Sequence, residues 1–207
     1  MTGGNRQRDK GAKRVSRIAL FVALLTVCAQ IFIPLPLGVP FTLQTFAVAA
    51  CALFLGADGV LAVCIYVFIG ACGLPVFSHF SSSAQLFSPT GGFIVGFIPS
   101  AAATTLLHAA LSRLCVRREK GSQTAESRRD CVSFGAAFLT AFFAALVGAI
   151  VCYLVGGAWY AAFFALKGTA KSFSAVLSFC VLPFLLPDLA KAALAAWLFA
   201  LLRRRLP

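Results

Sequence analysis

The amino-acid sequence predicts an all-α integral membrane protein: a bundle of six transmembrane helices with both termini in the cytoplasm. Composition is the first observation, because 60% of the 207 residues are hydrophobic, only 12% are charged, and the mean hydropathy is +0.93. A soluble domain is about half apolar and about a quarter charged. The second observation is that the apolar residues form separate runs, each approaching the roughly 20 residues that a helical crossing needs. The third is that basic clusters flank these runs.

Turns and prolines divide the apolar sequence into six spans. The first span ends at the proline-rich stretch 34–40, because proline cannot continue a helix. The glycine-containing turn 56–59 separates the second span from the third, and both are short enough that we expect tilt or partial burial. The predicted spans are 18–33, 41–55, 60–72, 92–115, 132–155 and 187–202, the last with an alternative start as early as 174.

The basic residues predict how the spans are oriented. They gather before the first span, around the hydrophilic segment 116–130, and at 203–205. Such clusters mark cytoplasmic segments. Four crossings bring 116–130 back to the side of the N-terminus, and two more bring back the C-terminus. We therefore expect a basic cytoplasmic tail 1–17, one membrane domain 18–202 with a cytoplasmic loop 116–130, and a basic tail 203–207. The segments 34–40, 73–91 and 156–174 are then outside.

The net charge of +12 also fits nucleic-acid binding. The basic residues lie beside the apolar runs, where they fix the orientation of the chain in the membrane. We therefore expect a lipid bilayer and no nucleic acid as partner. The beginning also resembles a secretory signal, with Val27-Cys28-Ala29 in the place of a cleavage site. Because further spans follow directly, we expect an uncleaved first helix.

Few residues are suited to metal binding or catalysis. The eight cysteines include no CxxC pair and lie mostly in apolar runs, where cysteine packs as a small hydrophobe. His79 and His108 are isolated from carboxylates and cysteines, and no Walker motif is present. We therefore expect no catalytic residue, no metal and no cofactor.

Asp188 and Lys191 are the strongest candidates for a binding site. Four of the six acidic residues lie in the predicted cytoplasmic segments and Asp58 lies in a turn, which leaves Asp188. Spacing of three residues places Asp188 and Lys191 on one helix face, able to pair or to share a ligand. An ionisable group inside a span costs about 2.5–3.5 kcal/mol on insertion scales, so it usually has a function. Alternatively, both residues have structural roles only: Asp188 interacts favourably with the dipole at a helix N-terminus, and the Lys191 side chain extends to the membrane interface.

Other polar and aromatic residues lie at the predicted outer ends of spans. Phe41, Thr42, Gln44 and the neighbouring Thr45 begin the second span, where they either bind a ligand or join helices. The segment Thr90-Gly91-Gly92 begins the fourth span, where backbone N–H groups can approach a polar ligand or simply form a turn. Phe77 and Phe93 fit an apolar ligand body and also fit interfacial anchoring.

Small residues four apart predict close helix packing. Gly92 and Gly96 form such a pair in the fourth span, and Ala19 and Ala23 form one near the cytoplasmic end of the first. The Ala19–Ala23 pair either packs within the bundle or meets a partner subunit.

Four sequence segments resemble the BioY family, the biotin-specific S components of energy-coupling factor (ECF) transporters. They occur in the family's order and extend the likeness from the first span to the last. Ser88 takes the place of an expected glycine, and 78–86 is less glycine-rich than expected. The segments are 39–45 (VPFTLQT), 73–77 (GLPVF), 88–97 (SPTGGFIVGF) and 186–191 (LPDLAK).

The resemblance implies a six-helix substrate-capture subunit of the ECF S-component type, holding biotin at the outer side. It also implies a scaffold subunit and two ATPase subunits as partners, with Ala19 and Ala23 as the scaffold-docking pair. The implied biotin-binding residues are Phe41, Thr42, Gln44, Phe77, Thr90, Gly91, Gly92, Phe93, Asp188 and Lys191.

Three other functions remain open at this point. An S component for another vitamin or small molecule shares the same fold. A membrane enzyme using Asp188 as acid or base lacks a second carboxylate, a histidine pair or a nucleophile nearby. A structural membrane subunit needs Asp188 and Lys191 only as an ion pair.

Overall fold

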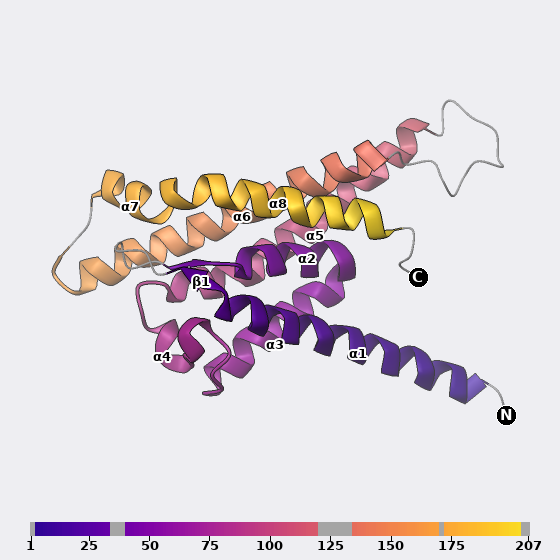
Figure 1. Ribbon diagram of the computed structural model, residues 1–207, viewed down its shortest axis with the longest axis horizontal. Coiled ribbons are helices and arrows are strands. Elements are labelled where there is room, and N and C mark those ends of the chain that lie inside the picture. Colours follow the sequence, from indigo (N-terminus) through magenta and orange to yellow (C-terminus); the bar gives the residue numbers. More distant parts are fainter. Residues whose placement is uncertain (1–2, 34–39, 120–133, 170–171, 204–207) are drawn as a thin grey trace.

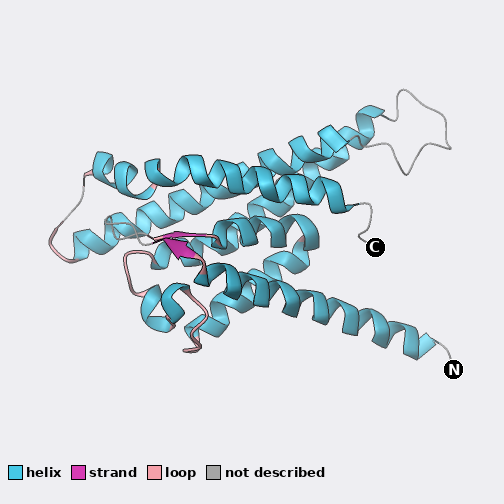
Figure 2. Cartoon of the chain, in the orientation of Figure 1, coloured by secondary structure: helices cyan, strands magenta, loops and turns pink. Residues whose placement is uncertain are grey.

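The computed structural model describes residues 3–33, 40–119, 134–169 and 172–203, which form a helical bundle with a short two-stranded sheet (Figures 1 and 2). Strands β1 (Phe32–Ile33) and β2 (Phe41–Thr42) pair antiparallel, with Phe32 opposite Thr42. The helices are α1 (Gly3–Gln30), α2 (Gln44–Leu55), α3 (Ala57–Ala71), the 3₁₀ turn η1 (Ser78–Phe80), α4 (Ser83–Leu86), α5 (Gly91–Glu119), α6 (Phe134–Leu166), α7 (Phe173–Cys180) and α8 (Leu182–Leu202).

The helix ends gather at two opposite ends of the bundle. Figure 1 shows α1 beginning, α5 ending, α6 beginning and α8 ending toward the right, where both termini lie. The sheet, α4 and α7 lie at the left end. The start of α1, the end of α5, the start of α6 and the end of α8 therefore lie at the same end of the bundle. Most of the predicted loop 116–130 lies outside the described residues, and its first four residues continue α5.

Among the described residues, three helices are long and apolar enough to cross a membrane by length and composition. These are Gly91–Cys115 within α5, all of α6 and all of α8. Helices α2 and α3 are apolar but shorter, with 12 and 15 residues. Helix α1 runs without interruption from the basic N-terminal residues to Gln30, so residue 17 is not a helix boundary. Lysine and arginine are good helix formers, which explains this continuity. The predicted end of the first span at 33 is wrong, because Phe32–Ile33 pair with β2 as strand β1.

Helix α6 corrects the predicted end of the fifth span. The span was expected to stop at 155, before an interfacial segment at 156–160, but α6 continues to Leu166. Gly156 lies against the ring of Phe93, where a Cβ atom would overlap it, and Tyr160 is buried with Cys180 and Phe184. This packing stabilises the helix beyond the weak helix propensity of its glycine pair.

The last membrane helix begins between the two starts that the sequence predicted, 174 and 187. Helix α7 ends at Cys180, the backbone breaks at Val181, and α8 starts at Leu182 with Pro183 in its first turn. Proline is tolerated there because the first N–H groups of a helix have no intrahelical partner. Pro187, expected to begin the span, lies inside α8 and removes one hydrogen bond.

Small residues bring α2, α6 and α8 close together. A buried cluster between these helices is rich in alanine. Gly148 of α6 lies so near Thr104 and Ser100 of α5 that a Cβ atom would overlap the Thr104 hydroxyl. Close backbone approach of this kind is typical of membrane helices. It allows side chains from four helices to meet at one site. The cluster contains Ala49, Leu53, Ala141, Ala145, Ala192, Ala195 and Ala196.

Candidate ligand-binding site

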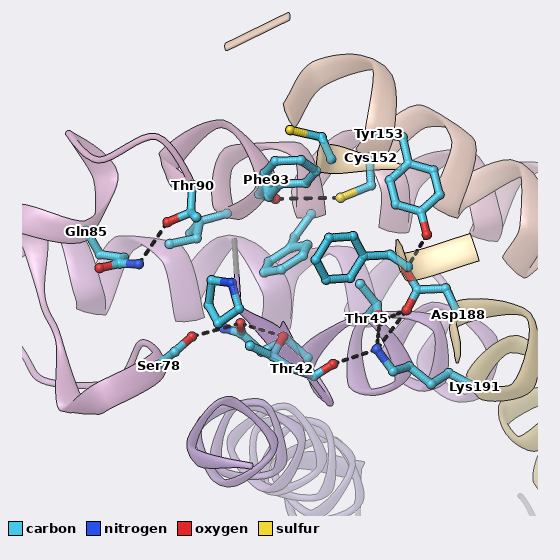
Figure 3. A pocket seen from close by; sticks show the side chains of 16 residues that line it. Thr42, Thr45, Ser78, Gln85, Thr90, Phe93, Cys152, Tyr153, Asp188 and Lys191 are labelled. Carbon is cyan, nitrogen blue, oxygen red and sulfur yellow. Dashed lines mark hydrogen bonds and ion pairs between the residues drawn. The ribbon is translucent and has the colours of Figure 1, made fainter. Parts of the chain in front are cut away.

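A cavity lies at the end of the bundle that holds the sheet and α4 (Figure 3). Its empty space amounts to about 570 Å³ with the open mouth included. Residues from six helices, strand β2 and the segment before it surround this space. The lining residues are Pro40, Thr42, Gln44, Thr45, Ser78, Gln85, Thr90, Phe93, Ile94, Phe97, Cys152, Tyr153, Cys180, Phe184, Asp188 and Lys191.

One end of the cavity carries a buried ion pair. Asp188 and Lys191 lie one turn apart on α8, and Lys191 Nζ is 2.7 Å from Asp188 Oδ1. The side chains are only 6% and 8% exposed, respectively. Two charges removed from water need excellent geometry and additional hydrogen bonds to persist. The neighbouring helices supply those bonds.

Thr45 and Tyr153 donate hydrogen bonds to the Asp188 carboxylate. Thr45 of α2 donates to Oδ1 over 2.9 Å, and Tyr153 of α6 donates to Oδ2 over 2.5 Å. Lys191 donates to the Thr42 carbonyl at 2.6 Å and to the Thr45 hydroxyl at 3.1 Å. Its ammonium also lies 3.9 Å from the centre of the Phe41 ring, a cation–π contact. All three ammonium protons of Lys191 therefore have protein acceptors.

Gln44 joins β2, α3 and η1. Its amide nitrogen donates to the Tyr66 hydroxyl at 2.6 Å, while its oxygen accepts from Thr42 and Ser78. Tyr66 in turn donates to the Val76 carbonyl. Gln44 is buried, so these bonds satisfy groups that would otherwise be unpaired in the core. The glutamine thus shapes one wall of the cavity while bonding to other helices.

The other end of the cavity is polar without being charged. Gln85 of α4 donates to the Thr90 hydroxyl at 2.8 Å, and Ser88 lies 2.8 Å from the same oxygen. Phe93, Phe97 and Phe184 add apolar side chains to the cavity lining. Such a cavity suits an elongated small molecule with a polar group at each end and an apolar middle. Within the described ranges, no group of three histidine, cysteine, aspartate or glutamate side chains is placed to hold a metal.

The structure brings six of the ten predicted binding residues to the cavity wall: Thr42, Gln44, Thr90, Phe93, Asp188 and Lys191. The remaining four make other contacts.

Phe41 and Phe77 lie next to the cavity residues. The Phe41 ring lies under the Lys191 ammonium. Phe77 is fully buried and packs edge-on against Tyr66, over Gly70.

Gly91 and Gly92 permit close backbone packing. A Cβ atom at Gly91 would overlap the Leu86 carbonyl, and one at Gly92 would overlap Trp159 of α6. These two glycines therefore position the start of α5 against α4 and α6.

Several lining residues were not predicted as site residues. Tyr153 is the most important, since it contacts Asp188 directly. A tyrosine within a strongly apolar span was the available signal, because a tyrosine hydroxyl in that position usually has a hydrogen-bond partner. Gln85, Cys152 and Phe184 carried no local pattern that separated them from packing residues, whereas Phe97 ends the family-like segment 88–97.

A second, smaller cavity lies deeper in the bundle. It shares Thr45, Cys152, Asp188 and Lys191 with the first and extends toward residues one turn further along the helices, including Ser100 and Thr104 of α5. The ion pair therefore lies between two spaces, of which the outer one is the larger.

Comparison with known proteins identifies the family. The sequence model of the BioY family matches residues 5–207. The chain belongs to the BioY family. It is 41% identical over 186 residues to a probable biotin transporter BioY of Pyrococcus horikoshii, covering 89% of this chain and 92% of that protein. It is 48% identical over 97 residues to the biotin transporter BioY of Thermotoga maritima, covering 46% of this chain and 57% of that protein.

A solved structure shares the fold. The crystal structure of the S component for biotin from an ECF-type ABC transporter matches with a TM-score of 0.72 and 20% sequence identity, covering 99% of this chain and 95% of that one. The predicted resemblance to BioY proteins is therefore confirmed. The fold is helical and of the S-component type, and the named relatives are transporters. Together with its apolar helices, this identifies the chain as a multi-pass membrane protein.

Proposed function

We propose that this chain binds biotin with high affinity and takes it up across the cytoplasmic membrane, as the substrate-specific subunit of an ECF-type transporter. Membership of the BioY family supports the substrate. The observation that carries the proposal is the buried Asp188–Lys191 pair at the end of an otherwise largely apolar cavity. A purely structural ion pair has no need of a cavity on its polar side.

The polar ends of the cavity differ in charge, and this difference orients biotin. Biotin has a neutral ureido ring with two N–H donors and one carbonyl, an apolar thioether ring, and a carboxylate on a flexible tail. We place the ureido ring at the ion pair, with N–H donated to Asp188 and the carbonyl accepting from Lys191. A carboxylate there would put a second negative charge beside buried Asp188, which is unfavourable where water is excluded.

The carboxylate then extends toward Gln85 and Thr90 at the uncharged end. Their amide and hydroxyl groups supply donors that can turn toward a carboxylate. The thioether ring lies between Phe93, Phe97 and Phe184, whose contact replaces water along the apolar middle of the ligand. Lys191 has to exchange one of its three protein acceptors for the ureido carbonyl.

Six helices are proposed to cross the membrane: α1, α2, α3, α5, α6 and α8. Both termini lie in the cytoplasm in this arrangement, as the positive-inside rule requires of the basic clusters. The cavity lies at the end of the bundle opposite the termini, so it opens to the outside. That placement suits a subunit that captures its substrate before transport.

The cytoplasmic half of α1 is the proposed contact with an ECF scaffold subunit, which two ATPase subunits drive. Ala19 and Ala23 are both exposed on α1, one turn apart. Small exposed residues with this spacing let a partner helix approach closely.

Calorimetric titration with biotin tests the proposal, using the protein purified in detergent and thiamine and riboflavin as controls. Saturable one-to-one binding of biotin alone is the expected result. Competition with dethiobiotin measures the preference within this ligand class. A folded protein that binds no biotin would reject the proposed substrate.

A further inference from the structure

We infer that Tyr153 is a positioning residue that holds the Asp188 carboxylate in the orientation needed to accept a ureido N–H. The inference rests on the proposed biotin site. Tyr153 lies on α6, outside the four family-like segments, and its hydroxyl donates a hydrogen bond to Asp188.

The two oxygens of Asp188 have different partners. Oδ1 accepts from Thr45 at 2.9 Å and from Lys191 at 2.7 Å, whereas the donor described for Oδ2 is the Tyr153 hydroxyl at 2.5 Å. A carboxylate has about four acceptor positions. Three are occupied by protein donors, which leaves Oδ2 with room for one donor from a ligand.

The donors also come from different helices. Lys191 shares α8 with Asp188 and therefore moves with it, while Thr45 lies on α2 and Tyr153 on α6. Thr45 ties Oδ1 to α2, and Tyr153 ties Oδ2 to α6 (Figure 3). With both oxygens held by separate helices, rotation of the carboxylate about its side-chain bond is restrained. Removing the Tyr153 hydroxyl would release the oxygen that has the free acceptor position.

Tyr160 provides a matched control on the same helix. It lies seven residues from Tyr153 and is buried among Cys180, Phe184 and Val176. Among the described residues, no hydrogen-bond partner of its hydroxyl is found, and Tyr160 does not line the cavity. Tyr160→Phe therefore removes the same atom from α6 without touching Asp188.

The test combines biotin titration with infrared spectroscopy of protein containing ¹³C-labelled aspartate. We expect Tyr153→Phe to weaken biotin binding by about 10- to 100-fold, the loss of one hydrogen bond to a charged group. We also expect it to shift the carboxylate band that responds to biotin. Tyr160→Phe should leave both the affinity and the band at their wild-type values.

Three results would overturn the inference. The first is wild-type affinity in folded Tyr153→Phe. The second is weaker binding with an unshifted carboxylate band, which would indicate a general packing defect. The third is wild-type protein that binds no biotin, which would reject the proposed function and this role together.

If Tyr153→Phe does not fold, 3-fluorotyrosine incorporated into the wild-type chain keeps the hydroxyl and makes it a stronger donor. This labelling should shift the aspartate carboxylate band that responds to biotin. An unchanged band would overturn the inference.

Discussion

Two aspartate ion pairs of the described residues lie in contrasting surroundings. Asp188 and Lys191 lie at the proposed outer end with side chains 6% and 8% exposed, whereas Arg14 and Asp58 lie at the other end with side chains 61% and 31% exposed. Arg14 holds Asp58 through both carboxylate oxygens, with Nε 2.9 Å from each. Asp58 also lies in the first turn of α3, where a negative charge is favoured by the helix dipole.

Environment, not pairing, distinguishes the proposed binding site from the exposed pair. The exposed pair has the better bidentate geometry, yet water and salt screen it and it borders none of the described cavities. The buried pair is held by Thr45, Tyr153 and the Thr42 carbonyl, and it borders two cavities. Buried charges with several protein partners are expensive to desolvate, which is why they mark functional sites in membrane proteins.

Lys191→Ala should have the largest effect. It leaves Asp188 buried without its cation, which costs about 3–5 kcal/mol, or a lowering of the melting temperature by about 6–20 °C for a chain of this size. Biotin affinity should fall by about a hundredfold or more, since the ureido carbonyl loses its donor. Calorimetry and thermal unfolding in detergent measure the two effects, and wild-type affinity would contradict the proposed site.

The double substitution Asp188→Leu with Lys191→Met separates stability from function. Replacing both charges by apolar groups removes the desolvation cost together with the attraction. The double variant should therefore melt at a higher temperature than Lys191→Ala while binding no biotin. A folded double variant with wild-type affinity would show that the ion pair is not the binding site.

Thr45→Val should have an intermediate effect. It removes a hydrogen bond to Asp188 and an acceptor for Lys191, so biotin affinity should fall by about tenfold, as expected for bonds to charged groups. Thr26→Val in α1 is the matched control, because the hydrogen bond described for the Thr26 hydroxyl goes to the Val22 carbonyl of its own helix. Equal losses in both variants would mean that threonine packing, not contact with the pair, determines the affinity.

Arg14→Gln should have the smallest effect. It removes the exposed pair, and at physiological salt the melting temperature should stay close to that of the wild type because exposed pairs are strongly screened. Biotin affinity should not change. A large loss of affinity in this variant would mean that the two ends of the bundle are coupled, and the comparison would fail.

Local patterns predicted much of the helical fold. Apolar runs bounded by proline and glycine located α2, α3, α5 and α8 to within about five residues, because helix formation depends on neighbouring residues. The start of α1 and the end of α6 were missed by more than ten residues. The errors lie where distant contacts override propensity, as at Gly156, whose place inside α6 is stabilised by Phe93 of α5. Pro187 was expected to begin the last span, but it lies inside α8, which starts at Leu182.

The sequence by itself determined the membrane character of the chain, its family and the Asp188–Lys191 pair. Each follows from composition, ordered motifs or i,i+3 spacing, which are properties of local sequence. Tertiary structure alone decided which groups surround that pair. Thr45 is 143 positions and Tyr153 is 35 positions from Asp188, and no sequence period links residues so far apart. Their meeting depends on how α2, α6 and α8 approach through small residues, and that packing converts an ion pair into a site.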